Sequence, residues 1–438
     1  MQWYHGALVM GVPFIVLLAL GLPVAFTFIF VMLAASIVFI GSPIGPYMTV
    51  LSLFDSIAIF TLAPVPLFVF MGEVMLVSGL AMKSLDALSK IVGRIPARLS
   101  LLATGGGALF GLLSGSTMAS TALLGSTLVP EMTKRGYSKA LSLGPILASG
   151  GLAMIIPPSS LAIIYGTTAE VPIGRLLVAG AIPGFIMAFN YSVQVLLRVK
   201  LNPSLAPPYE VTPIPAKEKL RLFVADLMPL SIIVFLVTGV FILGMATPTE
   251  AAALGAFGTV VVTACYGRLS RQVMVDALKG TVTISAMTLL IIGGSQIFSQ
   301  LLGYSGVTRT ITTYAVGLNL PPLGLLFIMI LVVLFLGCFM ESVPIMMVTT
   351  PIFVPVARHL GFDPVWFGVI MLISLQIGLT TPPFGLLLFV MKGVAPLGTT
   401  MRDLYSSALP FLLCDAITIL LVIAFPMLAL WLPRLLLG

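Results

Sequence analysis

Charged residues are scarce in this sequence. Lys, Arg, Asp and Glu make up 8% of its 438 residues, and hydrophobic residues make up 59%. Soluble globular domains carry about 25% charged residues, so the composition excludes that class. The formal net charge of +7 would favour nucleic-acid binding in a soluble protein, but here Lys and Arg gather in a few loops between apolar runs. That distribution follows the positive-inside rule of membrane proteins, and we expect no nucleic-acid partner.

Side chains for metal binding and acid–base catalysis are equally rare. The sequence has two His residues, His5 and His359, and three Cys residues without a CxxC spacing. It also lacks the HExxH, GxSxG and Walker-type phosphate-binding motifs. These absences argue against a zinc site, a histidine-centred hydrolase and an ATP-driven pump. We therefore predict that the protein is not an enzyme and that transport would run on an ion gradient.

Long apolar runs are what the sequence has instead. About ten runs approach the roughly 20 residues that a helix needs to cross a bilayer, and short polar joints separate them. The pattern predicts an all-α polytopic membrane protein, surrounded by lipid. Residues 1–5 contain no Lys or Arg, so we expect no cleaved signal peptide and a first helix that stays in the membrane.

The first half is interrupted at membrane depth. Residues 99–133 hold an SGST sequence near their middle, at Ser114–Thr117, which leaves arms of about 15 residues that are too short to cross comfortably. Basic residues flank the segment on both sides, so both of its ends should lie in the cytoplasm. We predict a re-entrant hairpin with its tip at SGST, followed by a crossing over 140–168 that breaks at Pro157-Pro158.

The second half repeats this arrangement at an offset of about 225 residues, and the Pro-Pro pair recurs at Pro382-Pro383. The repeat predicts a second hairpin over 322–356, with its tip near Glu341, and a second broken crossing over 364–391. Irregular backbone survives inside a bilayer only where protein or a polar cavity surrounds it. The coincidence of the breaks therefore indicates a site that both halves build.

The two copies occupy residues 1–200 and 227–438, and the Pro-rich, basic residues 201–226 form a predicted cytoplasmic linker. We count five crossings and a hairpin in each copy, and an odd number of crossings inverts the second copy. The few basic residues around the second hairpin agree with that inversion. The prediction is an inverted-topology repeat of about ten crossings and two hairpins, typical of elevator-type secondary transporters. Residues 83–98 add an amphipathic helix along the membrane surface.

Hydroxyl-bearing and small residues gather at the tips and the breaks. Open helix ends there offer carbonyl groups to Na⁺ and N–H groups to a carboxylate. The alternative is that these residues only mediate helix packing. Glu341 could bind Na⁺, couple protons or cap the hairpin turn. Glu73 and Gln296 could face the same cavity or serve in packing, and we expect Asp415 to be solvated near the end of a span.

Several long stretches resemble a known family. They are LFGLLSGSTMASTALLGSTLVPEMTKRGY from Leu109, GGLAMIIPPSSLAIIYGTTAEVPIGRLLVAGAIPG from Gly150, and GCFMESVPIMMVTTPIFVPVARHLGF from Gly337. They are similar to the large membrane subunit (DctM-like) of tripartite ATP-independent periplasmic, or TRAP, transporters. The resemblance implies Na⁺-driven import of an organic acid, such as a C4-dicarboxylate, sialic acid or a similar carboxylate, across the bacterial inner membrane by an elevator mechanism. It also implies a small four-helix (DctQ-like) membrane subunit and a periplasmic substrate-binding protein. A stand-alone Na⁺/dicarboxylate symporter of similar architecture is the alternative.

The resemblance further assigns residues to sites, with one Na⁺ site at each tip and its broken crossing and with substrate between the tips. The implied Na⁺ ligands are Ser114, Gly115, Ser149, Gly150, Gly151, Pro157, Gly337, Met340, Glu341, Thr380, Thr381 and Pro382. The expected substrate contacts are Ser116, Thr117, Ser120, Ser159, Gln296, Ser342 and Gln376. The family often has Asp at the position of Glu341 and Asn at the positions of Ser374 and Leu387, so this chain departs from it at the second tip.

Overall fold

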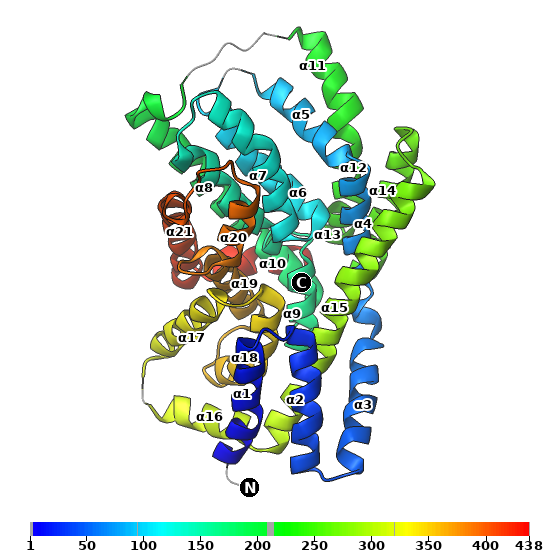
Figure 1. Ribbon diagram of the computed structural model, residues 1–438, viewed down its shortest axis with the longest axis vertical. Helices are drawn as coiled ribbons and strands as arrows, with labels where there is room; N and C mark the ends of the chain where they lie inside the picture. Colours follow the sequence, from blue (N-terminus) through cyan, green and yellow to red (C-terminus); the bar gives the residue numbers. More distant parts are fainter. Residues whose placement is uncertain (1–2, 94, 208–213, 319, 438) are drawn as a thin grey trace.

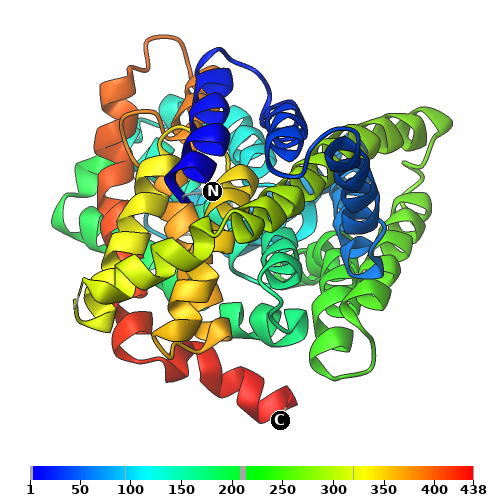
Figure 2. The same ribbon diagram turned by 90° about the horizontal axis from the view of Figure 1, so that it is seen from below.

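The computed structural model describes residues 3–93, 95–207, 214–318 and 320–437, and these residues form helices without a strand. Figure 1 shows an elongated bundle in which both halves of the chain contribute to the centre. Helices α1 to α3 lie along one edge of the bundle and α22 along the opposite edge (Figure 2). The prediction of an all-α membrane protein is confirmed for the part of the chain that is described.

The helices of the first half follow the predicted breaks. They are α1 (Trp3–Ala19), α2 (Val24–Phe39), α3 (Ile44–Ile57), α4 (Pro64–Val77), α5 (Leu80–Val92), α6 (Arg98–Ser114), α7 (Thr117–Lys134), α8 (Lys139–Gly150), α9 (Ser160–Thr168) and α10 (Ile173–Leu201). The segment predicted as the first hairpin consists of α6 and α7, and the segment predicted as the first broken crossing consists of α8 and α9.

The second half begins with α11 (Ala216–Leu222), α12 (Met228–Val234) and α13 (Val240–Ile242), which π-helical turns join into one helix over 216–242. The remaining helices are α14 (Pro248–Cys265), α15 (Arg271–Tyr304), α16 (Val307–Gly317), α17 (Pro322–Gly337), α18 (Ser342–His359), α19 (Pro364–Thr380), α20 (Leu386–Val394), α21 (Met401–Ala424) and α22 (Met427–Leu437). Adding 225 to the bounds of α7 gives 342–359, which are the bounds of α18.

One pair of elements departs from this correspondence. Helix α15 is continuous over 34 residues, whereas the equivalent stretch of the first half, 46–79, is divided between α3 and α4 around a short 3₁₀ turn, Phe60–Leu62. Pro64 opens α4, and a proline at that place suits the first turn of a helix but cannot continue a preceding one. The two halves therefore differ beside the cavity, which α4 and α15 both line.

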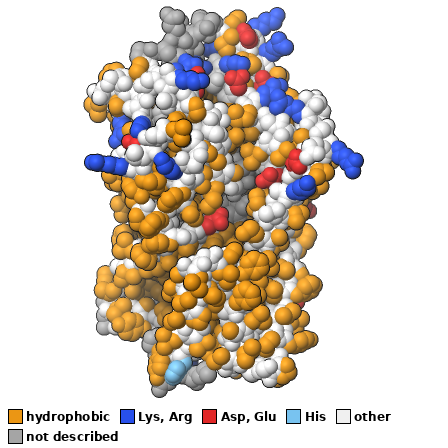
Figure 3. Space-filling model, viewed as in Figure 1, with side chains coloured by type: hydrophobic (Ala, Val, Ile, Leu, Met, Phe, Trp, Pro, Cys, Tyr) orange, Lys and Arg blue, Asp and Glu red, His pale blue; other side chains and the backbone are white. Residues whose placement is uncertain are grey.

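The two hairpins enter the bundle from opposite ends and their tips meet near the middle (Figure 1). Helix α5 lies at one end and α16, which follows α15 as α5 follows α4, lies at the other. Lys and Arg gather at the end with α5 and α11, and the visible face of the other end shows almost none (Figure 3). Between the ends, large apolar side chains cover the surface, as a lipid-facing belt requires.

Six helices of the described chain are long and apolar enough to cross a bilayer. The apolar helices α1, α2, α17, α19 and α22 are shorter, at 10–17 residues. Helices α8 and α9 divide one crossing between them, because η2 (Gly151–Met154) and the Pro-Pro pair interrupt it. The peptide bond within each of the Pro157-Pro158 and Pro382-Pro383 pairs is cis.

Two predicted boundaries differ from the structure. The amphipathic segment expected over 83–98 is the helix α5 over 80–92, because Gly93 adopts a left-handed φ of 69° and Arg98 already belongs to α6. The linker expected over 201–226 is shorter, because residues 216–226 are the first turns of the helix that continues to residue 242. Pro215 precedes that helix, where its fixed φ favours a helix start.

Candidate functional site

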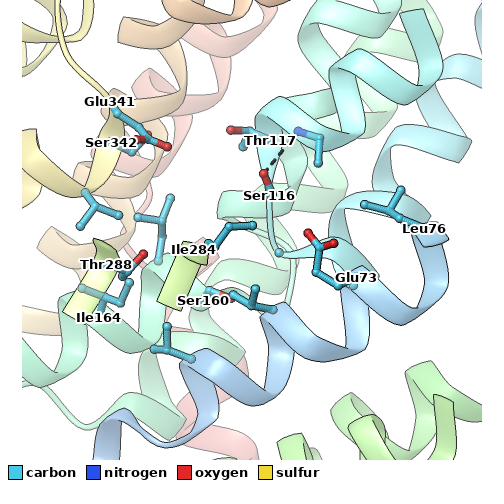
Figure 4. A pocket seen from close by; sticks show the side chains of 17 residues that line it. Glu73, Leu76, Ser116, Thr117, Ser160, Ile164, Ile284, Thr288, Glu341 and Ser342 are labelled. Atoms are coloured by element: carbon cyan, nitrogen blue, oxygen red, sulfur yellow. Dashed lines mark hydrogen bonds between the residues drawn. The ribbon is translucent and has the colours of Figure 1, made fainter. Parts of the chain in front are cut away.

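A cavity of ≈ 120 Å³ lies between the two hairpin tips. Helices α4, α9 and α15 complete its wall, so residues from both halves of the chain meet there (Figure 4). The polar and small side chains that line it are Gly72, Glu73, Gly115, Ser116, Thr117, Ser160, Thr288, Glu341 and Ser342. Polar and acidic side chains that gather around a cavity within an apolar belt mark it as a candidate binding site.

The first tip is a tight turn between α6 and α7. Gly115 ends α6 with a left-handed φ of 58°, a conformation that glycine adopts without steric cost. The hydroxyl oxygen of Ser116 then accepts a hydrogen bond from the N–H of Ala119 at 3.3 Å and caps the start of α7. The turn is also close-packed, because a Cβ on Gly115 would lie 2.7 Å from Oγ of Ser160. The tip therefore presents the positive end of α7 to the cavity.

The second tip separates α17 from α18, and Glu341 occupies the position just before α18. Its side chain makes no capping hydrogen bond; instead the carboxylate lines the cavity beside Ser342 (Figure 4). Behind this tip, Gly337 packs directly on Gly378 of α19, since a Cβ on Gly337 would lie 2.5 Å from the Cα of Gly378. The close approach of two backbones holds the second tip against its broken crossing.

The first broken crossing is packed just as closely behind the first tip. The Ser149 hydroxyl donates a hydrogen bond to the carbonyl of Ala103 in α6 at 2.9 Å. A Cβ on Gly107 of α6 would lie 2.2 Å from Oγ of Ser149. At the start of α9, Oγ of Ser159 accepts a hydrogen bond from the N–H of Ala162 at 3.1 Å. These contacts fix the arms of the hairpin to the interrupted helix.

Gln376 connects the two broken crossings. Its side chain is fully buried in α19, and its amide donates a hydrogen bond to the carbonyl of Ala148 at 3.3 Å. A Cβ on Gly151 would lie 1.6 Å from the side-chain oxygen of Gln376, so only glycine leaves room for this side chain. The second break is held by local hydrogen bonds, including that from the Thr381 hydroxyl to the carbonyl of Ile377 at 2.6 Å.

Comparison with known proteins identifies the family. The family model for the DctM component of the tripartite ATP-independent periplasmic transporter matches residues 12–428. The chain belongs to this family. It is 33% identical over 427 residues to the sialic acid TRAP transporter large permease protein of Vibrio cholerae, covering 96% of this chain and 97% of that one. It is also 33% identical over 395 residues to the C4-dicarboxylate TRAP transporter large permease protein of Pseudomonas aeruginosa, covering 88% of each.

The fold of this TRAP permease subunit also occurs in a more distant protein. The YdaH transporter of Alcanivorax borkumensis superposes with a TM-score of 0.61 over 90% of each chain at 14% sequence identity. That likeness concerns the fold alone. The family match shows a transporter subunit embedded in the membrane and not an enzyme, as the sequence predicted.

The cavity brings together part of the predicted TRAP site. The predicted residues that line it are Gly115, Ser116, Thr117, Glu341 and Ser342. The predicted residues outside its lining are Ser120, Ser149, Gly150, Gly151, Pro157, Ser159, Gln296, Gly337, Met340, Gln376, Thr380, Thr381 and Pro382. Most of this second group are buried in and behind the breaks, where their backbone shapes the tips. The Ser114 side chain lies outside the described residues.

The cavity also holds polar residues that the sequence did not single out as substrate contacts. Glu73, on α4, was left open between cavity and packing, and it lines the cavity opposite Glu341 (Figure 4). Ser160 and Thr288 line it as well. The position of Ser160 directly after Ser159 in the broken crossing was the available signal, whereas Thr288 lies in an uninterrupted helix that offers none.

The position of Asp415 differs from the one expected from the sequence. It was expected to be solvated near a span end, but it is 1% exposed within α21. The reason is that α10 packs along α21 and covers it, and the Tyr191 hydroxyl of α10 donates a hydrogen bond to the Asp415 carboxylate. Asn190 reinforces this contact by donating a hydrogen bond to Thr418 at 3.2 Å.

Proposed function

We propose that this chain is the transport subunit of a TRAP system that imports an organic acid together with Na⁺. Substrate occupies the cavity between the hairpin tips, and Na⁺ is held at the tips by helix-end carbonyls, hydroxyls and the Glu341 carboxylate. The observation that carries this proposal is the meeting of two hairpin tips, one from each half, at one cavity that polar side chains line. Hard oxygen ligands at open helix ends bind Na⁺ weakly enough to release it.

The packing of the helices supports an elevator motion. Helix α4 packs mainly against α14 and α15, whereas α6 and α7 pack mainly against α8, and α19 packs against α17 and α21. Smaller contacts, of α4 with α6 and of α15 with α18, join the two groups. The cavity lies between these two groups, with α4 and α15 on one side and the tips and α9 on the other. We infer that the hairpins and broken crossings slide as one body against a scaffold that contains α1, α2, α4 and α12 to α15. Cargo bound to the sliding body is then exposed first to one side of the membrane and afterwards to the other.

The family name implies three components, and we propose that this chain works with a small four-helix membrane subunit and a periplasmic protein that delivers the substrate. Uptake of labelled carboxylates into proteoliposomes tests the proposal. The vesicles hold this chain with its small subunit, with or without the periplasmic protein, under an imposed Na⁺ gradient. Uptake is expected to require both Na⁺ and the periplasmic protein, and the cargo that accumulates identifies the substrate.

The outcomes of that assay separate the alternatives. Uptake driven by Na⁺ that ignores the periplasmic protein would favour the stand-alone symporter. Uptake that is unchanged when choline replaces Na⁺ would contradict ion coupling through Na⁺. Glu341→Gln keeps the shape of the side chain but removes its charge, so it is expected to raise the Na⁺ concentration for half-maximal uptake by about tenfold, the effect of losing one partly buried charge interaction.

A further inference from the structure

The charged side chains that line the cavity are both acidic. Glu73 and Glu341 reach it from opposite walls, one from α4 and one from the second hairpin tip (Figure 4). None of the described residues that line the cavity is Lys, Arg or His. A site built for a dianion places cations on its wall, usually as bidentate Arg pairs. This cavity carries the opposite charge.

Neither carboxylate is paired with a cation of the described residues. The structure records no ion pair or side-chain hydrogen bond for Glu73 or Glu341 among the described residues. In contrast, other acidic side chains of the described chain do form ion pairs with Lys or Arg, such as Asp403 with Lys139 and Asp226 with Lys83. A carboxylate inside the membrane is costly unless it is paired, so both groups are available to charges that enter the cavity.

The remaining wall offers a place for an anionic group. Oγ of Ser160 is buried, has no hydrogen-bond partner and belongs to a side chain that is 8% exposed. It lines the cavity next to Gly115, at the first tip, where α7 begins. A hydroxyl donor beside the N-terminal end of a helix suits a carboxylate or sulfonate. Glu73 lies across from it on α4, close to the same tip (Figure 4).

We propose that the cargo class of this site is a small zwitterion, an organic acid that also carries an ammonium or amidinium group. Its acidic group binds at the first tip, against Ser116 and Ser160, and its cationic group faces Glu73, while Na⁺ neutralises Glu341. This inference rests on the proposed function, which it narrows from organic acids in general to acids with an internal positive charge.

Charge balance is the reason to prefer this class. With one Na⁺ bound at each tip, the negative charges of the two cavity carboxylates are neutralised. A bound zwitterion adds no net charge to this neutral site. A dicarboxylate would add two further negative charges to a site that must pass through the low-dielectric middle of the bilayer. Moving uncompensated charge there is unfavourable, and no cation in the cavity wall offsets it.

Binding of a matched four-carbon series to the purified subunit pair, in saturating Na⁺ and without the periplasmic protein, tests the inference. The probes are 4-aminobutyrate as the zwitterion, 4-hydroxybutyrate as the monoanion and succinate as the dianion, with ectoine as a cyclic amidinium acid. At least one zwitterion is expected to bind about tenfold more tightly than succinate, as for a charge-assisted hydrogen bond. Glu73→Gln should abolish that preference. Glu131→Gln should leave it unchanged, because Glu131 lies near the end of α7 that is remote from the tip.

Several results would overturn the inference. The first is that succinate binds more tightly than either zwitterion. The second is that neither zwitterion binds although Na⁺ raises the unfolding temperature of the protein, which shows that Na⁺ itself binds. The third is that the Glu73→Gln variant still prefers the zwitterion. Different results would contradict the proposed function. Uptake of succinate driven by Na⁺ would contradict the zwitterion class and leave Na⁺-coupled import standing, whereas absence of Na⁺-driven uptake for every cargo would contradict the import proposal itself.

Discussion

At the scale of single residues, the candidate site depends on glycines that permit contact between backbones. Gly107 and Gly105 lie two residues apart in α6, but only Gly107 faces the first broken crossing. Its Cβ would lie 2.2 Å from Oγ and 2.9 Å from the backbone carbon of Ser149, and nothing lies within 4 Å of a Cβ on Gly105. We expect Gly107→Ala to destabilise the protein by about 1–3 kcal/mol through overpacking and to lower Na⁺-driven uptake.

Gly105→Ala is the matched control. The same side-chain change in the same helix should be neutral or stabilising by at most about 1 kcal/mol, the helix-propensity gain of Ala over Gly. Thermal unfolding of the detergent-purified variants, monitored by size-exclusion chromatography, measures the effect of both substitutions. Equal unfolding temperatures for the two variants would show that the contact between α6 and Ser149 carries no strain.

Residues also show which parts of the site could be predicted. The tips were predictable because SGST and the Pro-Pro pairs cannot continue a helix, and Glu341 is an acid in an otherwise apolar run. Gln376 was expected to contact substrate, and the structure places it outside the cavity lining, against Ala148 and Gly151, which are far away in the sequence. Periodicity within one helix does not reveal which neighbour will cover a given face. Glu73 and Thr288 could not be assigned to the cavity for the same reason.

At the scale of elements, α5 is anchored to the scaffold. Lys83 forms an ion pair with Asp226 at 2.8 Å and lies 4.3 Å from the centre of the Tyr266 ring. The Ser84 hydroxyl donates to the carbonyl of Asp226 at 2.9 Å. The Asp226 side chain is 12% exposed, so water screens this pair less than a fully exposed one. A double-mutant cycle with Lys83→Met and Asp226→Asn is expected to give a coupling free energy of about 1 kcal/mol.

The pair Asp86 and Lys90, on the same helix, is the control. Its atoms are closer, at 2.6 Å, but the side chains are 61% and 52% exposed, and such (i, i+4) pairs contribute about 0.3–0.5 kcal/mol. A larger coupling for the exposed pair in urea unfolding would contradict the anchoring role. The helical period predicted α5 itself, because its charges and leucines fall on opposite faces. It did not predict Asp226, which lies beyond the linker.

At the scale of the whole molecule, the elevator proposal predicts that one group of helices moves against another. Val69 on α4 and Ala119 on α7 line the cavity from the two groups. With the native Cys residues replaced, a Val69→Cys/Ala119→Cys pair is expected to change its crosslinking yield at least about twofold between Na⁺-free buffer and Na⁺ with cargo, because a sliding body changes its contacts with the scaffold. Mass spectrometry of the crosslinked peptides measures the yield.

A Lys139→Cys/Asp403→Cys pair provides the internal standard, since the native side chains form an ion pair at 2.7 Å between α8 of the proposed moving body and α21, which packs on α8 and α19 and is expected to move with them. Its yield should stay constant. Parallel changes in both pairs would indicate reagent access rather than motion, and constant yields in both would contradict sliding. The repeat and its breaks were predictable at this scale, because they are periodic in the sequence. The asymmetry between α15 and the divided stretch of α3 and α4 was not predicted, although Pro64, which has no counterpart in α15, was the available signal.

That asymmetry bears on how such a chain can evolve. The position equivalent to Glu73 at the offset of 225 is Phe298, which packs against Phe14 and Phe28. Two identical half-length chains would carry the same residue at both positions. Either an acid would stand where Phe298 packs against Phe14 and Phe28, or a phenylalanine would stand where Glu73 lines the cavity. Joining the halves in one gene removes that constraint. One copy is then free to acquire a charged group for the cargo while the other keeps the hydrophobic contact that the fold requires.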